Sequence, residues 1–300
     1  QQRRCAYICF NRALADHLSV LIDGNAEVFT LDQLCVALAR QSGVAPDFSS
    51  TNAFALLRER MVAAPATERW DFLVVDEIQD LAPAWVEALR RFVAPGGAMY
   101  MLGDENQNLY TRGAHHWPDA VHIRSDDNFR SPRKVVDCIN LLGLCDAPVQ
   151  ARSPYSGDMP QFYTYDAQHP DAALGQVAAC VQRLRADGVA TADMAVISYS
   201  GKERSQVLTQ SHIAGVALNK ATGAYGADQK AVWTGGDLLV DTLYRFKGQS
   251  APVVILCEVD FEVLDDNARK RLFVAFTRAQ YRLVVVMSTR AESALMGSMA

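Results

Sequence analysis

Short apolar runs alternate along this chain with stretches of helical periodicity. Typical runs are FLVVD at residues 72–76 and VVILCEV at residues 253–259. Strands that are separated by helices are characteristic of βαβ units, in which successive strands lie parallel in one sheet. The alternation therefore predicts an α/β fold with mainly parallel sheets.

The predicted elements fall into two similar series that meet near residue 125. In the first series, strands are expected at 6–10, 27–30, 72–76, 98–102 and 121–123, and helices at 12–19, 31–41, 52–63 and 82–93. In the second, helices are expected at 131–143, 170–186, 202–212 and 265–276, and strands at 161–165, 194–198, 238–243, 253–259 and 282–287. The stretch 147–160, which is rich in Pro, Ser and Gly, is expected to be a surface loop, and the stretch 219–237 is expected to be a second loop-like insert. The series predict one domain over residues 1–125 and a second over residues 126–300.

The composition excludes several classes of protein. Of the 300 residues, 50% are hydrophobic and 21% are charged, which suits compact globular domains. The formal net charge of −5 gives no overall basic field, so any nucleic-acid contact must depend on a local groove. The seven cysteines form no Cys-x-x-Cys pair, which fits a reduced, cytoplasmic protein without a zinc site. No apolar stretch approaches the ~20 residues that a membrane span needs, so no membrane partner is expected.

Acidic residues directly follow the apolar run that ends at Val75. Asp76 and Glu77 come first, and Asp80 lies three residues further on. Because ligands bind at the carboxyl ends of parallel strands, Asp76 and Glu77 are expected at the rim of a site. Asp76 could hold Mg²⁺ through water, and Glu77 could orient or deprotonate an attacking water. The alternative is that Asp76 is an ordinary loop residue, and Asp80 is expected to cap the following helix.

The next predicted strand ends in GDENQNLY, residues 103–110. Gly103 allows a tight turn, and Asp104 and Gln107 would then lie beside the carboxylates of the neighbouring strand. The Gln107 amide donates and accepts hydrogen bonds, so it could bind a γ-phosphate or the attacking water. The Tyr110 ring could stack on a base. Alternatively, this segment is a polar turn without a chemical role.

Further candidates lie in the second series. Arg130 in NFRSP and Arg278 in RLFVAFTRA could each face phosphates as arginine fingers, or could make ordinary surface ion pairs. Thr242 and Lys247, in the loop DTLYRFKGQS, suit contacts to a nucleic-acid backbone. The alternative for this loop is a solvated hairpin.

Taken in order, these segments resemble the superfamily 1 helicases of the UvrD/Rep/PcrA type. YICFNRALADHL and FTLDQLC resemble motifs Ia and Ib, while FLVVDEIQD and GDENQNLYTRGA are similar to motifs II and III. NFRSP resembles the arginine-bearing motif that opens the second domain, and AVISYSGKERSQVL is a weaker match to motif IV. TLYRFKGQSAPVVIL and RLFVAFTRA resemble motifs V and VI. The segments keep the order of the family from residue 6 to residue 286.

The resemblance implies two RecA-like domains of the P-loop NTPase type, with ATP held between them and single-stranded or partly duplex DNA running across them. It assigns Mg²⁺ binding to Asp76, the catalytic base to Glu77 and the sensing of the γ-phosphate to Gln107. It makes Arg130 and Arg278 the arginines that reach the nucleotide. The implied function is that of an ATP-dependent DNA helicase or translocase, with 3′→5′ polarity.

The resemblance also gives candidates for DNA contact at Asn11, Tyr110, Thr242 and Lys247. Among these, the ring of Tyr110 is the strongest candidate. Thr111 stands where the family often has a Trp, so one stacking ring is expected to be missing.

One motif of the family, the phosphate loop Gly-x-x-x-x-Gly-Lys-[Ser/Thr], does not occur in the 300 residues. Its Gly-Lys pair is found only at Gly201-Lys202, in a different context. In the family the loop precedes motif Ia, so the first domain is expected to be truncated at its N-terminus. Without the loop, this chain alone should bind ATP poorly and hydrolyse it negligibly. A missing N-terminal segment or a protein partner would have to supply the loop.

An alternative is a non-hydrolysing DNA-binding or scaffold protein built on a degenerate helicase fold. In its favour, Ser250 stands where the family has a Glu that contacts the nucleotide sugar. Against it, the chain keeps the residue types that catalysis needs, such as Asp76 and Glu77. A third possibility is a regulatory subunit that supplies its arginines to the ATP of another chain.

Overall fold

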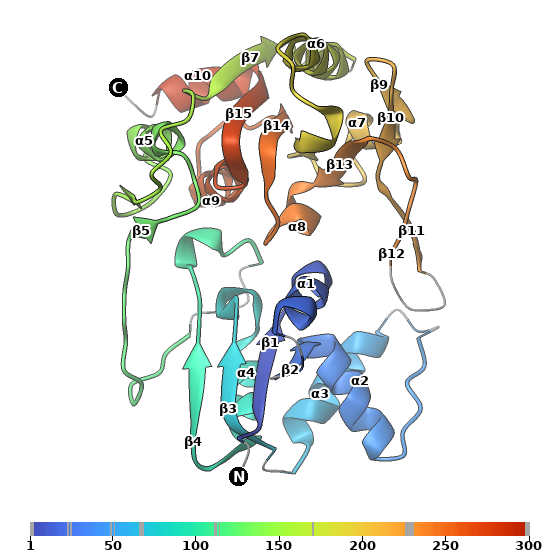
Figure 1. Cartoon of the computed structure of the whole chain (residues 1–300), viewed down its shortest axis with the longest axis vertical. Helices are drawn as coiled ribbons and strands as arrows, with labels where there is room; N and C mark the ends of the chain where they lie inside the picture. The colour runs from blue at the N-terminus through green and yellow to red at the C-terminus, as the bar shows by residue number, and fades with distance from the viewer. Residues whose placement is uncertain are drawn as a thin grey trace. The chain divides into compact units, whose positions relative to one another are not determined.

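A computed structural model describes residues 3–22, 24, 26–48, 50, 52–65, 69–110, 113, 115–169, 171–225 and 231–297. Contacts divide the chain into two compact units, Gln1–Val121 and His122–Ala300. Each unit is built on one mainly parallel sheet with helices packed against it (Figure 1), which confirms the predicted α/β class.

The first unit has a four-stranded sheet in the order β2-β1-β3-β4, and every pairing in it is parallel. Its strands are β1 (Cys5–Cys9), β2 (Glu27–Thr30), β3 (Trp70–Val75) and β4 (Val93–Met101). Its helices are α1 (Arg12–Ile22), α2 (Leu31–Gln41), α3 (Ala53–Ala63) and α4 (Pro83–Arg90), with short 3₁₀ helices η1 (Ile78–Asp80) and η2 (Glu105–Gln107).

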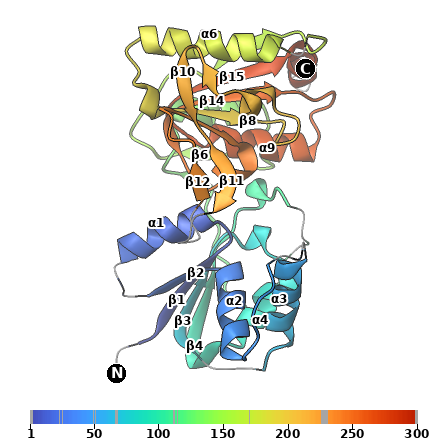
Figure 2. The same cartoon turned by 90° about the vertical axis from the view of Figure 1, so that its right-hand side faces the viewer.

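The core of the first unit lies between the sheet and the helices α2, α3 and α4, which share one face of it (Figure 2). Ile8 and Leu73 point into this core and are fully buried, whereas Tyr7 and Val74, which alternate with them, are only partly buried. This alternation follows from the two-residue period of a strand that has only one well-covered face.

The second unit has a seven-stranded sheet in the order β7-β15-β14-β8-β13-β10-β9, parallel except for the β9–β10 pair. Its strands are β7 (Gln161–Tyr165), β8 (Met194–Ser198), β9 (His212–Ile213), β10 (Val216–Asn219), β13 (Leu238–Thr242), β14 (Ala251–Val259) and β15 (Ala279–Ser288). Two small pairs accompany it, β5 (Asp127–Asn128) with β6 (Gln150–Ala151), and β11 (Ala221–Tyr225) with β12 (Ala231–Trp233). Its helical segments are α5 (Arg133–Leu141), α6 (Ala172–Ala186), η3 (Thr191–Asp193), α7 (Gln206–Thr209), α8 (Leu243–Phe246), α9 (Asp266–Phe276) and α10 (Thr289–Gly297).

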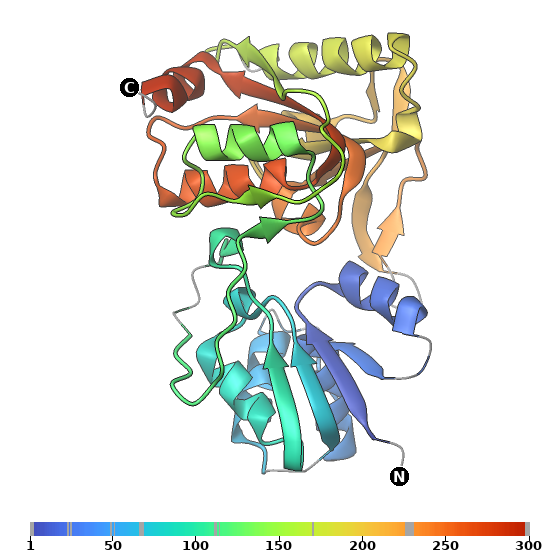
Figure 3. The ribbon, with the colours of Figure 1, turned by 60° about the vertical axis from the view of Figure 1, so that its left-hand side comes forward.

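The central strands of the second unit are covered on both faces. Figures 2 and 3 show α6 on one face of the sheet and α9 on the other. All residues of β8 are buried, as are residues 253–259 of β14 and 283–288 of β15. Because both faces are covered, these strands carry continuous apolar runs and not an alternating pattern.

Several expected elements differ in the structure. Residues 121–123 form no strand: Val121 and Ile123 are each 91% exposed, and no described strand pairs with them. The helix expected at 202–212 shrinks to α7, because Ser205 caps it at its start and β9 follows it. The loop expected at 219–237 contains the antiparallel pair β11–β12.

The expectation for Asp80 is also wrong. Helix α4 begins at Pro83 with Ala82 as its N-cap, and no side chain caps it. Asp80 is buried within η1.

Within the ranges that the structure describes, no helix has the length and apolar character needed to cross a bilayer.

Two glycines of the second unit give opposite predictions for substitution by alanine. A Cβ at Gly236 would lie 2.4 Å from the Ala217 carbonyl oxygen, a backbone atom that also accepts the Asp237 N–H. We therefore expect Gly236→Ala to lower the free energy of unfolding by about 2 kcal/mol, as overpacking does. Gly175 is exposed on α6, and no atom lies within 4 Å of a Cβ placed there. Gly175→Ala should therefore raise the free energy of unfolding by about 0.5–1 kcal/mol.

Chemical denaturation of both variants checks this pair of predictions. A Gly236→Ala protein that is as stable as the parent would contradict the packing described for β10 and β13.

Candidate active site

Four parallel strands end at one edge of the sheet in the first unit, and Asp76 follows the central strand β3 there. Its backbone N–H donates to the Ile8 carbonyl on β1 at 2.8 Å. Its Oδ1 accepts the Glu77 N–H at 2.8 Å, and its Oδ2 accepts the Tyr7 hydroxyl at 2.5 Å. These bonds fix the direction of the Asp76 carboxylate at the carboxyl edge of the sheet.

Burial and the neighbouring carboxylate keep two groups on β1 protonated. Burial raises the pKa of Tyr7 well above its usual value, and the hydrogen bond to Asp76 raises it further. Burial raises the pKa of the Cys9 thiol to about 12, again with a contribution from Asp76. Tyr7 is therefore a neutral donor to Asp76, and Cys9 is a poor nucleophile at neutral pH.

Glu77 has a left-handed backbone, with φ 53° and ψ 44°. This conformation is unfavourable for a residue with a Cβ, by roughly 1–2 kcal/mol. Surrounding bonds maintain it: the Ile78 N–H donates to the Leu102 carbonyl at 3.0 Å, and the Asp80 N–H donates to the Glu77 carbonyl at 2.8 Å. The chain thereby turns sharply from β3 into η1, and strain is concentrated at the candidate catalytic base.

Gln107 is the last residue of η2, in the segment that follows the neighbouring strand β4. Its Nε2 donates to Asp104 Oδ2 at 2.7 Å, and the Asp104 N–H donates to Gln79 Oε1 at 3.0 Å. Gln79 in turn donates to Glu77 Oε2. The structure thus brings Asp76, Glu77 and Gln107 to one edge of the sheet, within one hydrogen-bonded region.

Sequence reasoning missed Gln79, although it lies inside VVDEIQD. The available signal was a long polar side chain two positions after Glu77, in a segment that is otherwise apolar or acidic. In the structure Gln79 is 1% exposed.

The two DNA-contact candidates of the first unit lie at the same edge. Asn11 follows β1, and its Oδ1 accepts the Leu14 N–H at 3.4 Å at the start of α1. The Tyr110 ring lies 5.4 Å, centre to centre, from the ring of Phe10, at an interplanar angle of 59°. Thr111 lies outside the described residues.

The donor set at this edge fits Mg²⁺ held mainly by water and phosphate. In the described part of the chain, no group of three or more His, Cys, Asp or Glu side chains converges on a possible metal position. Mg²⁺ commonly keeps several waters and takes only one or two carboxylates together with substrate phosphates. Asp76, whose direction is fixed by its hydrogen bonds, suits that arrangement.

In the second unit, Arg130 is exposed on a turn that Asn128 organises. Asn128 Oδ1 accepts the Arg130 N–H at 3.0 Å and the Ser131 N–H at 2.8 Å. The guanidinium of Arg130 is therefore presented on a short, hydrogen-bonded turn just before α5.

Arg278 is placed differently, because it is only 1% exposed. Its Nε donates to the Val274 carbonyl at 2.9 Å, and its guanidinium also donates to the Gln249 carbonyl at 3.3 Å. These bonds attach the loop before β14 to the end of α9. A phosphate contact by Arg278 stays a prediction.

Thr242 and Lys247 are both buried, at 6% and 4% exposure. The Thr242 hydroxyl accepts the Arg245 N–H at 3.3 Å and caps α8. The exposed cation of this segment is Arg245, whose guanidinium lies 5.5 Å from the centre of the Trp233 ring. DNA contact by Thr242 and Lys247 stays a prediction, and Arg245 is an additional candidate.

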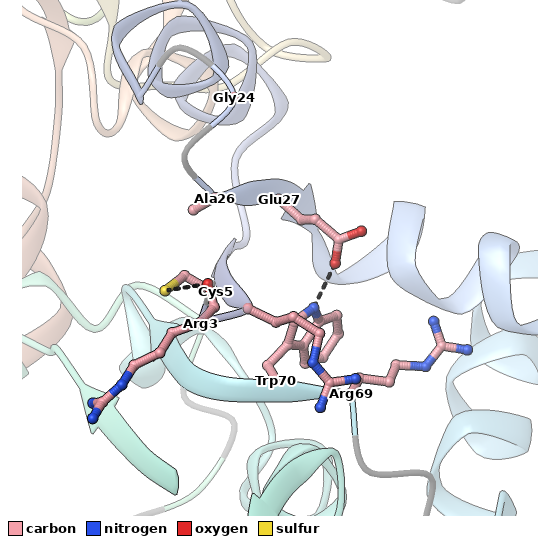
Figure 4. Close-up of a pocket in the computed structure, with 8 residues that line it drawn as sticks. Arg3, Cys5, Gly24, Ala26, Glu27, Arg69 and Trp70 are labelled. Carbon is pink, nitrogen blue, oxygen red and sulfur yellow. Dashed lines mark hydrogen bonds between the residues drawn. The ribbon is translucent and has the colours of Figure 1, made fainter. Parts of the chain in front are cut away.

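A separate cavity of about 700 Å³ lies at the opposite, amino ends of β1, β2 and β3. Figure 4 shows Arg3 and Arg69 around it, with the Trp70 indole donating to Glu27. It holds none of the candidate residues, so we do not assign the chemistry to it.

The left-handed backbone of Glu77 leads to a stability prediction. Glycine adopts this conformation without the Cβ penalty, so Glu77→Gly should be more stable than Glu77→Ala by about 1 kcal/mol. Thermal or chemical denaturation of the two variants measures the difference. A Glu77→Ala protein that is the more stable of the two would show that Glu77 is not held in this conformation.

Comparison with known families places these features in context. Residues 23–117 match the model of the UvrD/REP helicase N-terminal domain, and residues 237–286 match that of the UvrD-like helicase C-terminal domain. The first match includes Asp76 and Glu77, and the second includes Arg278. No curated protein matches the sequence significantly. With one match in each unit, both units of the chain are similar to domains of the UvrD/Rep-type helicases.

Proposed function

We propose that this chain is the motor core of an ATP-dependent DNA helicase or translocase that acts on single-stranded DNA. The observation that carries the proposal is the set of Asp76, Glu77 and Gln107 at one edge of a parallel sheet, in a segment that matches a helicase domain. Carboxylates and an amide in that position suit the positioning of a nucleotide phosphate and of a water.

Each residue has a role that its surroundings support. Asp76, fixed by Tyr7 and by its own turn, holds Mg²⁺ through water. Glu77 accepts the proton of the attacking water, and Gln107 contacts the γ-phosphate. When bound, Mg·ATP supplies the phosphoryl group that is transferred to water. Arg130 and Arg278 stay candidates for neutralising charge on the phosphates.

DNA contact is proposed at the carboxyl edge of the first unit, through Tyr110 and Asn11. The support is that Asn11 follows β1 and that the Tyr110 ring packs on Phe10, the residue just before Asn11. A ring held by another ring offers a rigid platform on which a base can stack. The family resemblance favours movement in the 3′→5′ direction.

Hydrolysis also requires a phosphate loop, which residues 1–300 do not contain. We expect the chain alone to hydrolyse ATP negligibly, because the backbone N–H groups and the Lys of that loop carry most of the phosphate affinity. The enzyme assays therefore require a protein that contains the phosphate loop, or the chain together with a protein that supplies it.

Glu77→Gln tests the role of the catalytic base. The amide keeps the size of the side chain but accepts no proton, so the turnover of ATP should fall by about 10²–10⁴-fold. The affinity for Mg·ATP should change by less than about twofold, because the change affects chemistry and not uniform binding. Steady-state phosphate release and fluorescent-nucleotide titration measure the two quantities.

Glu87→Gln is the matched control, since Glu87 is exposed on α4 and forms an ion pair with Arg90, one helical turn away. Normal turnover in Glu77→Gln would refute the assigned base. A parent protein that folds and binds DNA, and that holds a phosphate loop without hydrolysing ATP, would favour the non-hydrolysing DNA-binding or scaffold alternative.

Tyr110→Ala tests the stacking platform. Loss of a base–aromatic stack is worth about 1–3 kcal/mol, so the affinity for labelled oligothymidylate should fall by roughly tenfold in fluorescence anisotropy. Tyr110→Phe retains the ring and should bind within about twofold of the parent. Equal binding by Tyr110→Ala and the parent would exclude Tyr110 from the DNA path.

A further inference from the structure

We infer that Gln79 is a positioning residue that ties the Glu77 carboxylate to the loop carrying Gln107. The inference rests on the proposed function for its consequence in turnover, but its geometry can be tested without nucleotide. It concerns a side chain to which the sequence comparison assigned no role.

The orientation of the Gln79 amide follows from its partners. The Asp104 backbone N–H, 3.0 Å away, can only donate, so the atom that faces it must be the amide oxygen. The amide nitrogen therefore faces Glu77 Oε2 and donates to it. One planar group thus holds a carboxylate at one end and the backbone of the neighbouring strand end at the other.

Burial shows that this arrangement is specific. Gln79 is 1% exposed, and an amide that is buried without hydrogen-bond partners is destabilising. An apolar side chain of similar size, such as Met, would fill the same space without burying a polar group. The polar side chain is explained by the two hydrogen bonds that it makes, and both of them lead to the candidate catalytic edge.

The connection continues beyond Asp104. Asp104 Oδ1 accepts the Asn106 N–H at 3.0 Å, and its Oδ2 accepts Gln107 Nε2 at 2.7 Å. Hydrogen bonds thus run from Glu77 through Gln79 and Asp104 to Gln107. They join the residue that activates water to the residue proposed to contact the γ-phosphate.

Gly103 allows the two strand ends to approach closely enough for this connection. A Cβ at Gly103 would lie 2.7 Å from Ile78 Cγ1 and 3.1 Å from Gln79 Oε1. Either contact would push η1 away from the end of β4. The absence of a side chain at Gly103 and the hydrogen bond from Asp104 to Gln79 therefore both keep η1 close to the end of β4.

The direction of the Glu77 carboxylate therefore depends on Gln79. The left-handed backbone of Glu77 turns the side chain away from the path of β3, and Gln79 then fixes the carboxylate relative to the loop of Gln107. Catalytic groups must be held within fractions of an ångström of their productive position. Loss of the two Gln79 hydrogen bonds should therefore reduce turnover more than nucleotide binding.

Two substitutions separate the two ends of the amide. Gln79→Met removes both hydrogen bonds while keeping the length of the side chain. Gln79→Glu retains an oxygen that accepts the Asp104 N–H, but it replaces the amide donor with a second buried carboxyl group that must share one proton with Glu77, which weakens Glu77 as a base. The Asp104 contact should therefore survive in Gln79→Glu and be lost in Gln79→Met.

Hydrogen exchange of the Asp104 amide, followed by NMR without nucleotide, measures the contact directly. The exchange rate should rise by roughly tenfold in Gln79→Met, as expected for loss of one buried hydrogen bond, and stay near the parent rate in Gln79→Glu. Unchanged protection in Gln79→Met would overturn the inference.

Turnover in the protein that holds a phosphate loop measures the consequence. Both variants should lower kcat by about 10–100-fold and leave the KM for ATP within about twofold, because orientation is lost and binding is not. The double variant Gln79→Met/Gln107→Ala should lose less than the sum of the two single effects, because both residues act through Asp104. Strict additivity would contradict a connection between Gln79 and Gln107.

Gln33→Met is the matched control. The Gln33 amide oxygen accepts the Thr30 N–H at 2.7 Å in the capping box of α2, so its loss also removes a bond from a backbone N–H to a side chain. It should reduce stability without changing kcat or the protection of Asp104. A loss of kcat in Gln33→Met equal to that in Gln79→Met would reduce the role of Gln79 to general stability and overturn the inference.

The design keeps two failures apart. If the parent protein does not hydrolyse ATP while the Asp104 amide responds as expected, the proposed function is wrong and the tether is supported. If the parent hydrolyses ATP and Gln79→Met does so equally fast, the function stands and the positioning role is refuted.

Discussion

The parallel pairing of β1, β3 and β4 is the constraint on which the candidate site depends. Since these strands run in the same direction, residues that directly follow each of them meet at one edge of the sheet. The pairing places Asp76 beside the end of β1 and Gln107 beside the end of β3, although these positions are far apart in the chain. A shift of one residue between β3 and β4 would move the Asp104 N–H away from Gln79 and disconnect the site.

Strain and burial then refine what the sheet brings together. Glu77 is held in an unfavourable backbone conformation by a bond within η1 and by the bond from the Ile78 N–H to the Leu102 carbonyl at the end of β4. Gln79 and Asp80, which follow Glu77 closely in the chain, are buried, and the Gln79 amide donates a hydrogen bond to the Glu77 carboxylate. In the second unit the two candidate arginines differ in burial. Arg278 lies inside the unit and stabilises the loop before β14, whereas Arg130 is exposed on a turn.

The sequence allowed prediction of those parts of the fold that depend on local pattern. Continuous apolar runs located β8, β14 and β15, and the position of carboxylates after β3 located the edge where Asp76 and Glu77 lie. Features that depend on tertiary partners were not predictable. Val121 and Ile123 look like a strand but have no described partner, and the pair β11–β12 is hidden in a stretch rich in loop residues. A single left-handed residue such as Glu77, or an amide aimed at a neighbouring strand, leaves no periodic signal at all.

We propose that this edge of the sheet belongs to a motor driven by DNA-dependent ATP hydrolysis. The most direct test is the ATPase rate of the protein that holds its phosphate loop, measured with and without saturating single-stranded DNA. We expect DNA to raise kcat by about tenfold or more, because the proposed DNA contacts of Tyr110 and Asn11 lie at the same edge as the loop that carries Gln107. A folded, DNA-binding protein whose ATPase rate is the same with and without DNA would contradict it.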